Sequence, residues 1–448
     1  MSVDLVLKDL KAYVNNAVIE CCLAIKDRKI FKIGKESHMP KAEAALSLEG
    51  LLVMPGLIDV HVHLRDEGKS HKEDFKSGTA AAAAGGITTV LDMPNNDPMT
   101  MDTETLRNRM KAAKEKILVN VGFYSEFPKN LREIGEIIRE GAIAFKLFMG
   151  EQLGGLNIED DSAIKEAFKV VGRKVPVAVH AEDKETLKSA EKELKRRGCN
   201  DIEAFIDAHS EEAELKAVKR IIAVVKETGT RVHFCHISTE KSLKLVNDAK
   251  KAGLPITCEA TPHHLFLSLE DLKRIGALTL TVPPVREKSH SDALWEGIKN
   301  GLVDIIASDH APHAVAEKSA DVVWDVKVGI PGLETTLPLL LTEVNNGRLG
   351  LADIVRLMAE NPAKIFGLKD KGSLKKGNKA DLVAVDLSRE YRIDASKFYS
   401  KAKYSPFDGM QVKGKPVKTF VGGLLIMDEG EIVVKEGCGE IIKGLSEP

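Results

Sequence analysis

The chain has 448 residues, of which 43% are hydrophobic and 29% charged, a composition typical of a globular enzyme. Its 65 basic and 67 acidic residues give a net charge of −2, which argues against a broadly basic nucleic-acid-binding surface. No apolar run reaches the roughly 18 residues of a membrane helix. The N-terminal residues lack a secretion signal, and the six cysteines are irregularly spaced. We therefore expect a cytoplasmic protein that contacts neither nucleic acid nor membrane.

Short strand-like segments separated by turns occupy both ends of the chain. They are residues 4–7, 18–25, 29–33 and 46–53 at the N-terminal end, and 379–385, 417–421, 423–427 and 431–435 at the C-terminal end. Between them the pattern changes to an alternation of apolar strands and helices. The eight candidate strands are 57–62, 87–92, 117–122, 142–147, 175–180, 231–236, 255–259 and 303–308, and the helical segments include 103–116, 184–197, 211–228 and 239–252.

Alternating strands and helices predict a parallel sheet. Eight repeats are typical of a (β/α)8 barrel, whereas a doubly wound sheet is the alternative. No G-x-G-x-x-G motif follows the first strand, which favours the barrel. We predict an α/β fold with a (β/α)8 barrel over residues 55–368, and a small β-sandwich domain formed by residues 1–54 and 369–448.

Side chains that can bind metal follow several of the predicted strands, at the end where barrel enzymes place their sites. His61 and His63 are two residues apart, so in an extended strand they point to the same side and can share one metal ion, unless they are simply two partly exposed histidines. His180 and His236 end the fifth and sixth strands, where a lone histidine is more often a core residue. Asp309 follows the eighth strand and could bind metal and act as a general base, or cap the next turn.

Lys146 interrupts the apolar run of the fourth strand. A buried lysine is costly unless it is paired or chemically altered, although many mid-strand lysines extend to the surface. A desolvated lysine with a lowered pKa can react with CO₂ to form a carbamate. The two carbamate oxygens would then bridge two cations.

Taken together, these motifs resemble the amidohydrolase superfamily and, within it, the dihydroorotases. The segments that carry the resemblance are Asp59-Val-His-Val-His-Leu-Arg65, Asp92-Met-Pro-Asn95, Phe145-Lys-Leu-Phe148, His180-Ala-Glu182, Cys235-His236, residues 257–265, Ala307-Ser-Asp-His-Ala-Pro-His313 with Lys318, and Gly329-Ile-Pro-Gly-Leu-Glu334. They span the whole predicted barrel. A further likeness is Gly377-Asn-Lys-Ala-Asp381, where this superfamily re-enters its small β domain.

The resemblance implies a two-zinc centre bridged by a carboxylated lysine and a hydroxide. The implied ligands are His61, His63 and Asp309 for one zinc, His180 and His236 for the other, and Lys146 as the bridge. Asp309 would also shuttle the proton. Arg65, Asn95 and His313 match the positions that bind the substrate. The implied reaction is the reversible cyclisation of N-carbamoyl-L-aspartate to L-dihydroorotate, the third step of pyrimidine synthesis.

Several alternatives stay open at this point. A sister cyclic amidase, such as an allantoinase or a dihydropyrimidinase, shares the metal ligands but needs no guanidinium, so Arg65 favours an anionic substrate. A non-catalytic scaffold would typically have lost a ligand. Cys235 and Glu259 could bind an extra zinc or be a buried thiol and a supporting carboxylate. Val282 stands where many dihydroorotases have asparagine, so it could contact a ring only through its backbone.

The partner that we expect is a small-molecule substrate, and the resemblance leaves open a homo-oligomer or association with a carbamoyltransferase. We also expect the glycine-rich segment Met149–Asn157, which follows the fourth strand, to act as a mobile lid. The alternative for this segment is an ordinary surface loop.

Overall fold

The predicted central strands form a parallel barrel. In the computed structural model, which describes residues 2–444, these strands are hydrogen-bonded to one another in the order β6 to β13. A parallel bridge between Val62 of β6 and His310, which follows β13, joins the first strand to the last. The third strand begins three residues later than predicted, at Asn120, and the eighth contains only two residues. The strands are β6 (Leu57–Val62), β7 (Ile87–Asp92), β8 (Asn120–Glu126), β9 (Ala144–Phe148), β10 (Val177–His180), β11 (Val232–Phe234), β12 (Ile256–Ala260) and β13 (Ile305–Ile306).

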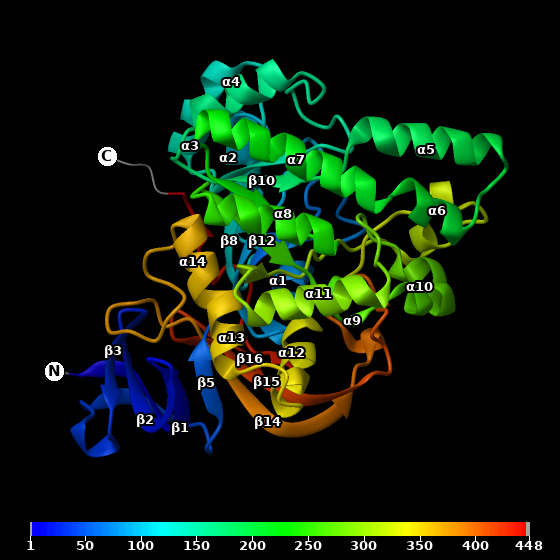
Figure 1. The fold of residues 1–448 in the computed structure, drawn as a ribbon. Helices are drawn as coiled ribbons and strands as arrows, with labels where there is room; N and C mark the ends of the chain where they lie inside the picture. Colours follow the sequence, from blue (N-terminus) through cyan, green and yellow to red (C-terminus); the bar gives the residue numbers. More distant parts are fainter. Residues whose placement is uncertain (1, 445–448) are drawn as a thin grey trace.

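Helices surround this barrel (Figure 1). Their ends follow capping rules: in α8 the Thr239 side chain accepts a hydrogen bond from the backbone N–H of Ser242, and Gly253, with φ +82°, follows the helix end. The α-helices are α1 (Phe75–Ala84), α2 (Thr103–Lys114), α3 (Ile134–Glu140), α4 (Asp161–Val171), α5 (Lys184–Arg196), α6 (Ile202–Ala208), α7 (Glu211–Thr228), α8 (Glu240–Lys251), α9 (Pro262–Phe266), α10 (Leu269–Ile275), α11 (Lys288–Lys299), α12 (Thr336–Asn345), α13 (Leu351–Val355) and α14 (Asn361–Phe366).

The two ends of the chain pair into a second, mostly antiparallel sheet beside the barrel, at the lower left of Figure 1. The junction is the antiparallel pairing of β5 (Leu52–Pro55) with β14 (Leu382–Arg392). The order of the sheet is β17-β16-β15-β14-β5-β1-β2-β3, with β4 beside β1. Its other strands are β1 (Val3–Val14), β2 (Ala17–Lys26), β3 (Lys29–Gly34), β4 (Ala42–Ser47), β15 (Gln411–Val421), β16 (Leu424–Asp428) and β17 (Glu431–Ile432).

The predicted fold class is therefore confirmed. A last short strand, β18 (Ile441–Ile442), leaves the terminal sheet and pairs with β8 of the barrel. Within residues 2–444, no helix combines the length and the apolar character that crossing a bilayer requires.

Candidate active site

Three predicted ligands converge at the C-terminal ends of β6 and β13. The Nε2 atoms of His61 and His63 lie 3.2 and 3.3 Å from Oδ1 of Asp309. All three side chains are buried or nearly so. Two imidazole nitrogens facing one carboxylate oxygen form a donor set that suits a divalent metal ion.

Buried partners hold these ligands in place. Glu259 at the end of β12 forms a short hydrogen bond with Nδ1 of His61, and Oδ1 of Asn95 lies 2.7 Å from Nδ1 of His63. Each contact places a proton on Nδ1 and leaves the Nε2 lone pair free for a metal. In the middle of β6, the carboxylate of Asp59 accepts hydrogen bonds from the backbone N–H groups of His61 and Ser308, which ties the first strand to the last.

The second pair of predicted ligands lies at the ends of two adjacent strands, with His180 ending β10 and His236 two residues after β11. Nδ1 of His180 is 3.0 Å from Nε2 of His236, so two ring nitrogens point toward one another. The other nitrogen of His180 lies 2.9 Å from Oε2 of Glu182, whose second oxygen lies 2.9 Å from Nδ1 of His209. Glu182 therefore fixes the tautomer of His180 that leaves Nδ1 free for a metal.

Lys146 is fully buried in β9 and lines the same cavity as both sets of ligands. Its Nζ is 2.9 Å from Sγ of Cys235, and within residues 2–444 no carboxylate lies within ion-pair distance of it. A buried ammonium without a counter-charge is unfavourable, which is the condition that favours conversion to a carbamate.

These residues fit a metal centre. His61, His236 and Asp309 offer ligand atoms that all lie within 4.8 Å of one another. Burial lowers the pKa of His61, His63 and His236, so their imidazoles are neutral, as metal ligands must be. His236 and Asp309 adopt φ values of +30° and +46°, which are uncommon for non-glycine residues.

A cavity of about 500 Å³ opens above these ligands. The three residues predicted to bind substrate, Arg65, Asn95 and His313, all line it. Strand β6 ends at Val62 and Arg65 has φ +62°, so Arg65 is not part of the extended strand. A turn brings Arg65 to the cavity instead, and this turn is held by Asp92, which accepts a hydrogen bond from the backbone N–H of Leu64.

The guanidinium of Arg65 is buried without a counter-ion. Its Nε has no hydrogen-bond partner among residues 2–444, and no carboxylate of these residues lies within 4 Å of it. Burial lowers the pKa of Arg65 to about 10, so the group remains charged at neutral pH. A buried, charged fork with a free donor is a binding site for an anion.

His313 lies next to Arg65. Its Nε2 donates to the carbonyl of Val328 at 2.9 Å, and its Nδ1 accepts from Nζ of Lys72 at 3.0 Å. Burial, together with the charges of Arg65, Lys72 and Lys318, lowers the pKa of His313 to about 2. His313 is therefore neutral beside the charged Arg65.

Comparison with known proteins agrees with this geometry. The sequence profile described as the amidohydrolase family matches residues 52–426. The chain belongs to the amidohydrolase family. This amidohydrolase is therefore a hydrolase, and the profile covers every residue of the candidate metal centre.

Two kinds of relative are similar over nearly the whole length. A dihydroorotase of Methanothermobacter thermautotrophicus is 39% identical over 420 residues, covering 94% of this chain and 93% of the relative. An L-hydantoinase of Paenarthrobacter aurescens is 35% identical over 447 residues, covering 98% of both. Among solved structures, the L-hydantoinase (dihydropyrimidinase) from Arthrobacter aurescens superposes with a TM-score of 0.94 at 34% identity, covering 98% of this chain and 100% of that one.

The sequence interpretation missed several supporting residues of this amidohydrolase. His209 lines the cavity and contacts Glu182, but it lies between two helices and in no recognised motif. Glu182 was quoted only as part of a motif. Glu259 was expected to be a supporting carboxylate or an extra zinc ligand, but its contact with His61 depends on how separate elements pack. The buried pair of Arg109 and Asp92 was also missed, since α2 shows only a polar surface pattern around Arg109.

Lys318 is a buried lysine behind the cavity wall of the amidohydrolase. Its Nζ donates to the carbonyls of Leu280 and Gly329 at 3.1 and 3.0 Å, and burial lowers its pKa from 10.5 to about 7. Between these two pKa values the unfolded chain binds more protons than the folded one, so Lys318 makes the free energy of unfolding rise with pH by up to about 1 kcal/mol per pH unit.

We therefore expect Lys318→Met to flatten the pH dependence of stability. Urea unfolding of both proteins at about pH 7.5 and about pH 9.5 measures the effect, and the wild type should gain more free energy of unfolding than the variant on going to the higher pH. Parallel pH dependence in the two proteins would show that Lys318 titrates normally in the folded chain.

The segment predicted to be a lid follows β9 and reaches the cavity. Leu153 lines the cavity, and Gly154 packs against the buried side chain of Glu126, where a Cβ would come within 2.2 Å of the Glu126 Cγ. The backbone N–H of Gly155 donates to the carbonyl of Phe127 at 2.9 Å. Within the segment, the side-chain amide of Gln152 donates to the carbonyls of Gly154 and Leu156. The segment thus covers one side of the cavity, while its mobility stays a prediction.

Deleting residues Leu153–Leu156 should lower kcat/KM by about tenfold, because water would reach the substrate and the substrate would be held less firmly. The deletion lies outside the metal ligands, so the metal content should not change and serves as the control. Steady-state kinetics with unchanged kcat and KM would instead identify the segment as an ordinary surface loop.

Proposed function

We propose that the protein is a dihydroorotase that catalyses the reversible cyclisation of N-carbamoyl-L-aspartate to L-dihydroorotate. The observation that carries this proposal is the buried guanidinium of Arg65, which lines the cavity and has no counter-ion among residues 2–444. The carboxylate of dihydroorotate would supply the missing negative charge through a paired, charge-assisted hydrogen bond. The reaction would be the third step of pyrimidine synthesis.

The residues of the cavity have separate roles in this reaction. Arg65 binds the substrate carboxylate, with His313 beside it. Asn95 uses its carbonyl oxygen to orient His63, so its amide N–H₂ group can donate to the substrate. Asp309 accepts the proton of the attacking water during ring opening and returns it to the ring nitrogen that leaves.

We further propose that the cofactor is a pair of Zn²⁺ ions. His61, His63 and Asp309 would hold one ion, and His180 and His236 the other. When bound, the two ions would lower the pKa of water so that hydroxide is available at neutral pH, and they would polarise the amide carbonyl. Lys146 would join the two sites as a carbamate, formed when its neutral amine attacks CO₂ and releases one proton.

A hydantoinase is the second candidate, and the similarity to the L-hydantoinases favours it. The same metal ligands could open a neutral five-membered cyclic ureide. A neutral ring, however, would leave the buried positive charge of Arg65 without a counter-charge when substrate is bound, which costs binding energy. Arg65 therefore favours an anionic ring.

The test is turnover of the zinc-loaded protein with dihydroorotate, hydantoin, dihydrouracil and allantoin side by side. We expect dihydroorotate to have the highest kcat/KM by at least about tenfold, which corresponds to the 1.5–3 kcal/mol of one charge-assisted contact. Faster turnover of hydantoin than of dihydroorotate would overturn the proposal in favour of the second candidate.

A further inference from the structure

A segment from the C-terminal part of the chain reaches the candidate active site from outside the barrel. Residues Phe398–Phe407, here called the strap, lie in the connection between β14 and β15 of the terminal sheet. Near one end of the strap, the backbone N–H groups of Tyr399 and Ser400 donate to the carboxylate of Glu334 at 2.8 and 3.2 Å. Near the other end, the hydroxyl of Tyr404 donates at 3.2 Å to the carbonyl of Gly329, which lines the cavity.

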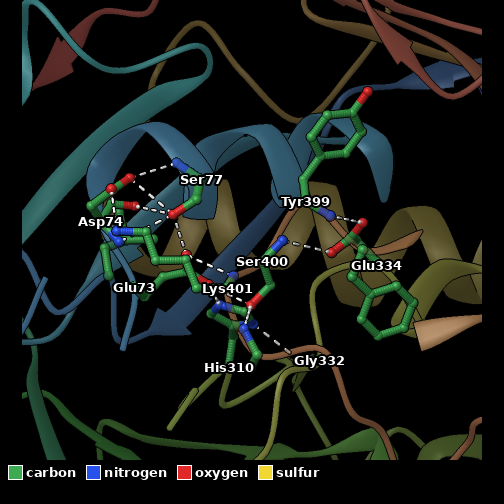
Figure 2. Close-up of polar contacts among 12 residues, drawn as sticks. Glu73, Asp74, Ser77, His310, Gly332, Glu334, Tyr399, Ser400 and Lys401 are labelled. Carbon is green, nitrogen blue, oxygen red and sulfur yellow. Dashed lines mark hydrogen bonds and ion pairs between the residues drawn. The ribbon is translucent and has the colours of Figure 1, made fainter. Parts of the chain in front are cut away.

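The strap binds a second buried carboxylate, that of Glu73. The hydroxyl of Ser400 donates to Oε2 of Glu73 at 2.5 Å, and the backbone N–H of Lys401 donates to Oε1 at 3.3 Å. Figure 2 shows Ser400 between the carboxyl groups of Glu73 and Glu334. Glu73 is fully buried, and within residues 2–444 no lysine or arginine pairs with it. Its charge is therefore stabilised by hydrogen bonds alone, and the strap provides two of them.

Glu73 in turn contacts His310, the residue after Asp309. Oε2 of Glu73 lies 3.3 Å from Nε2 of His310, while the backbone N–H of Gly332 donates to Nδ1 of His310 at 3.1 Å (Figure 2). Because Nδ1 accepts, the proton lies on Nε2 and is donated to Glu73. The ring of His310 is thus held on both sides.

The backbone of His310 connects this ring to the metal ligands. Its carbonyl accepts a hydrogen bond from the backbone N–H of His63 at 2.8 Å, and its N–H donates to the hydroxyl of Ser308 at 3.0 Å. Asp309 lies between Ser308 and His310 at φ +46°, a conformation that persists only where the surroundings enforce it. Fixing His310 therefore fixes Asp309 on one side and His63 on the other.

We propose that the strap is a positioning element of the active site: Ser400, acting through Glu73 and His310, holds Asp309 and His63 in the geometry that proton transfer and metal binding require. The strap does not touch the reacting atoms. The proposal rests on the proposed function only in that Asp309 moves a proton and His63 binds metal, and it applies equally to dihydroorotate and to hydantoin.

The experiment compares zinc-loaded wild type with Ser400→Ala and Glu73→Gln. Removing the Ser400 hydroxyl should lower kcat by about tenfold and change KM by less than about twofold, because outer contacts of metal sites typically control activity by 10–100-fold. Glu73→Gln should lower kcat at least as much. Both variants should also hold His63 less firmly, so zinc loss into excess chelator should be about tenfold faster than in the wild type. The rate of zinc loss is measured without substrate.

The matched control is Ser396→Ala, which removes a hydroxyl that bonds only the exposed Asp394 on the same connection. It should match the wild type in kcat and in zinc loss. The proposal would be overturned if wild type, Ser400→Ala and Glu73→Gln had equal kcat and equal rates of zinc loss, even if both variants melted at a lower temperature. If one variant does not fold, the other decides the question.

Failure of the proposed function gives a different result. Assays use whichever of dihydroorotate and hydantoin the wild type turns over faster, so a hydantoinase would still reveal the effect of the strap on kcat. Zinc loss reports on the strap even if neither substrate is turned over.

Discussion

Lys146→Ala should lose most of its activity and one of its two metal ions. In the wild type, Lys146 is buried and lines the same cavity as both groups of histidine ligands, and we propose that it bridges two zinc ions as a carbamate. Removing it takes away an anion that both ions would share. Mutating a residue that only contacts a metal ligand typically lowers activity or metal affinity 10–100-fold, so we expect the loss of a bridging ligand to lower kcat by more than about a hundredfold. Metal content, measured by elemental analysis, should fall from about two ions to about one.

Two further measurements separate the carbamate from the charge of the lysine. Lys146→Arg keeps the positive charge but cannot form a carbamate, so it should be as inactive as Lys146→Ala. Short carboxylates such as formate or acetate should restore part of the activity and of the second metal ion in Lys146→Ala, since they can occupy the space of the lost side chain. A Lys146→Ala variant with two metal ions and near-normal turnover would contradict the assignment of Lys146 as the bridging ligand.

Arg65→Met should have a selective effect on the anionic substrate. Methionine keeps much of the side-chain volume but removes the buried guanidinium, which has no counter-ion of its own among residues 2–444. The lost contact is a charge-assisted one worth on the order of 1.5–3 kcal/mol, so kcat/KM for dihydroorotate should fall at least about tenfold, and further if the ring is misplaced. Steady-state kinetics on the zinc-loaded variant measures this loss.

A neutral substrate is the control for Arg65. Turnover of hydantoin or dihydrouracil by Arg65→Met should fall much less than turnover of dihydroorotate, because these rings carry no carboxylate. Arg65→Lys should recover part of the dihydroorotate activity, since it restores a charge but not the planar fork. Equal losses for charged and neutral rings at unchanged metal content would mean that Arg65 supports the site in general and does not recognise the carboxylate.

The sequence by itself determined the barrel and which candidate ligands follow its strands. Apolar strands and helices alternate along the central region, and this local pattern places a strand end near each of His61, His180, His236 and Asp309. Because the C-terminal ends of parallel strands meet at one end of a barrel, ligands far apart in the chain could be grouped without knowing any contact. The pairing of the first and last segments into one sheet was predictable in the same way, from their shared strand and turn pattern.

Only the tertiary structure decided what orients these ligands. Glu259 contacts His61 over a separation of 198 residues, and Ser400 contacts Glu73 over a separation of 327 residues, although neither contact follows from a local repeat. Arg65 faces the cavity through a turn at positive φ and not through strand alternation. The hydrophobic periodicity and composition of a segment predict which way a side chain points only relative to its own strand or helix. The partners of a buried carboxylate or guanidinium are instead set by how separate elements pack, because each buried charge must find its donors or counter-ions wherever the folded chain provides them.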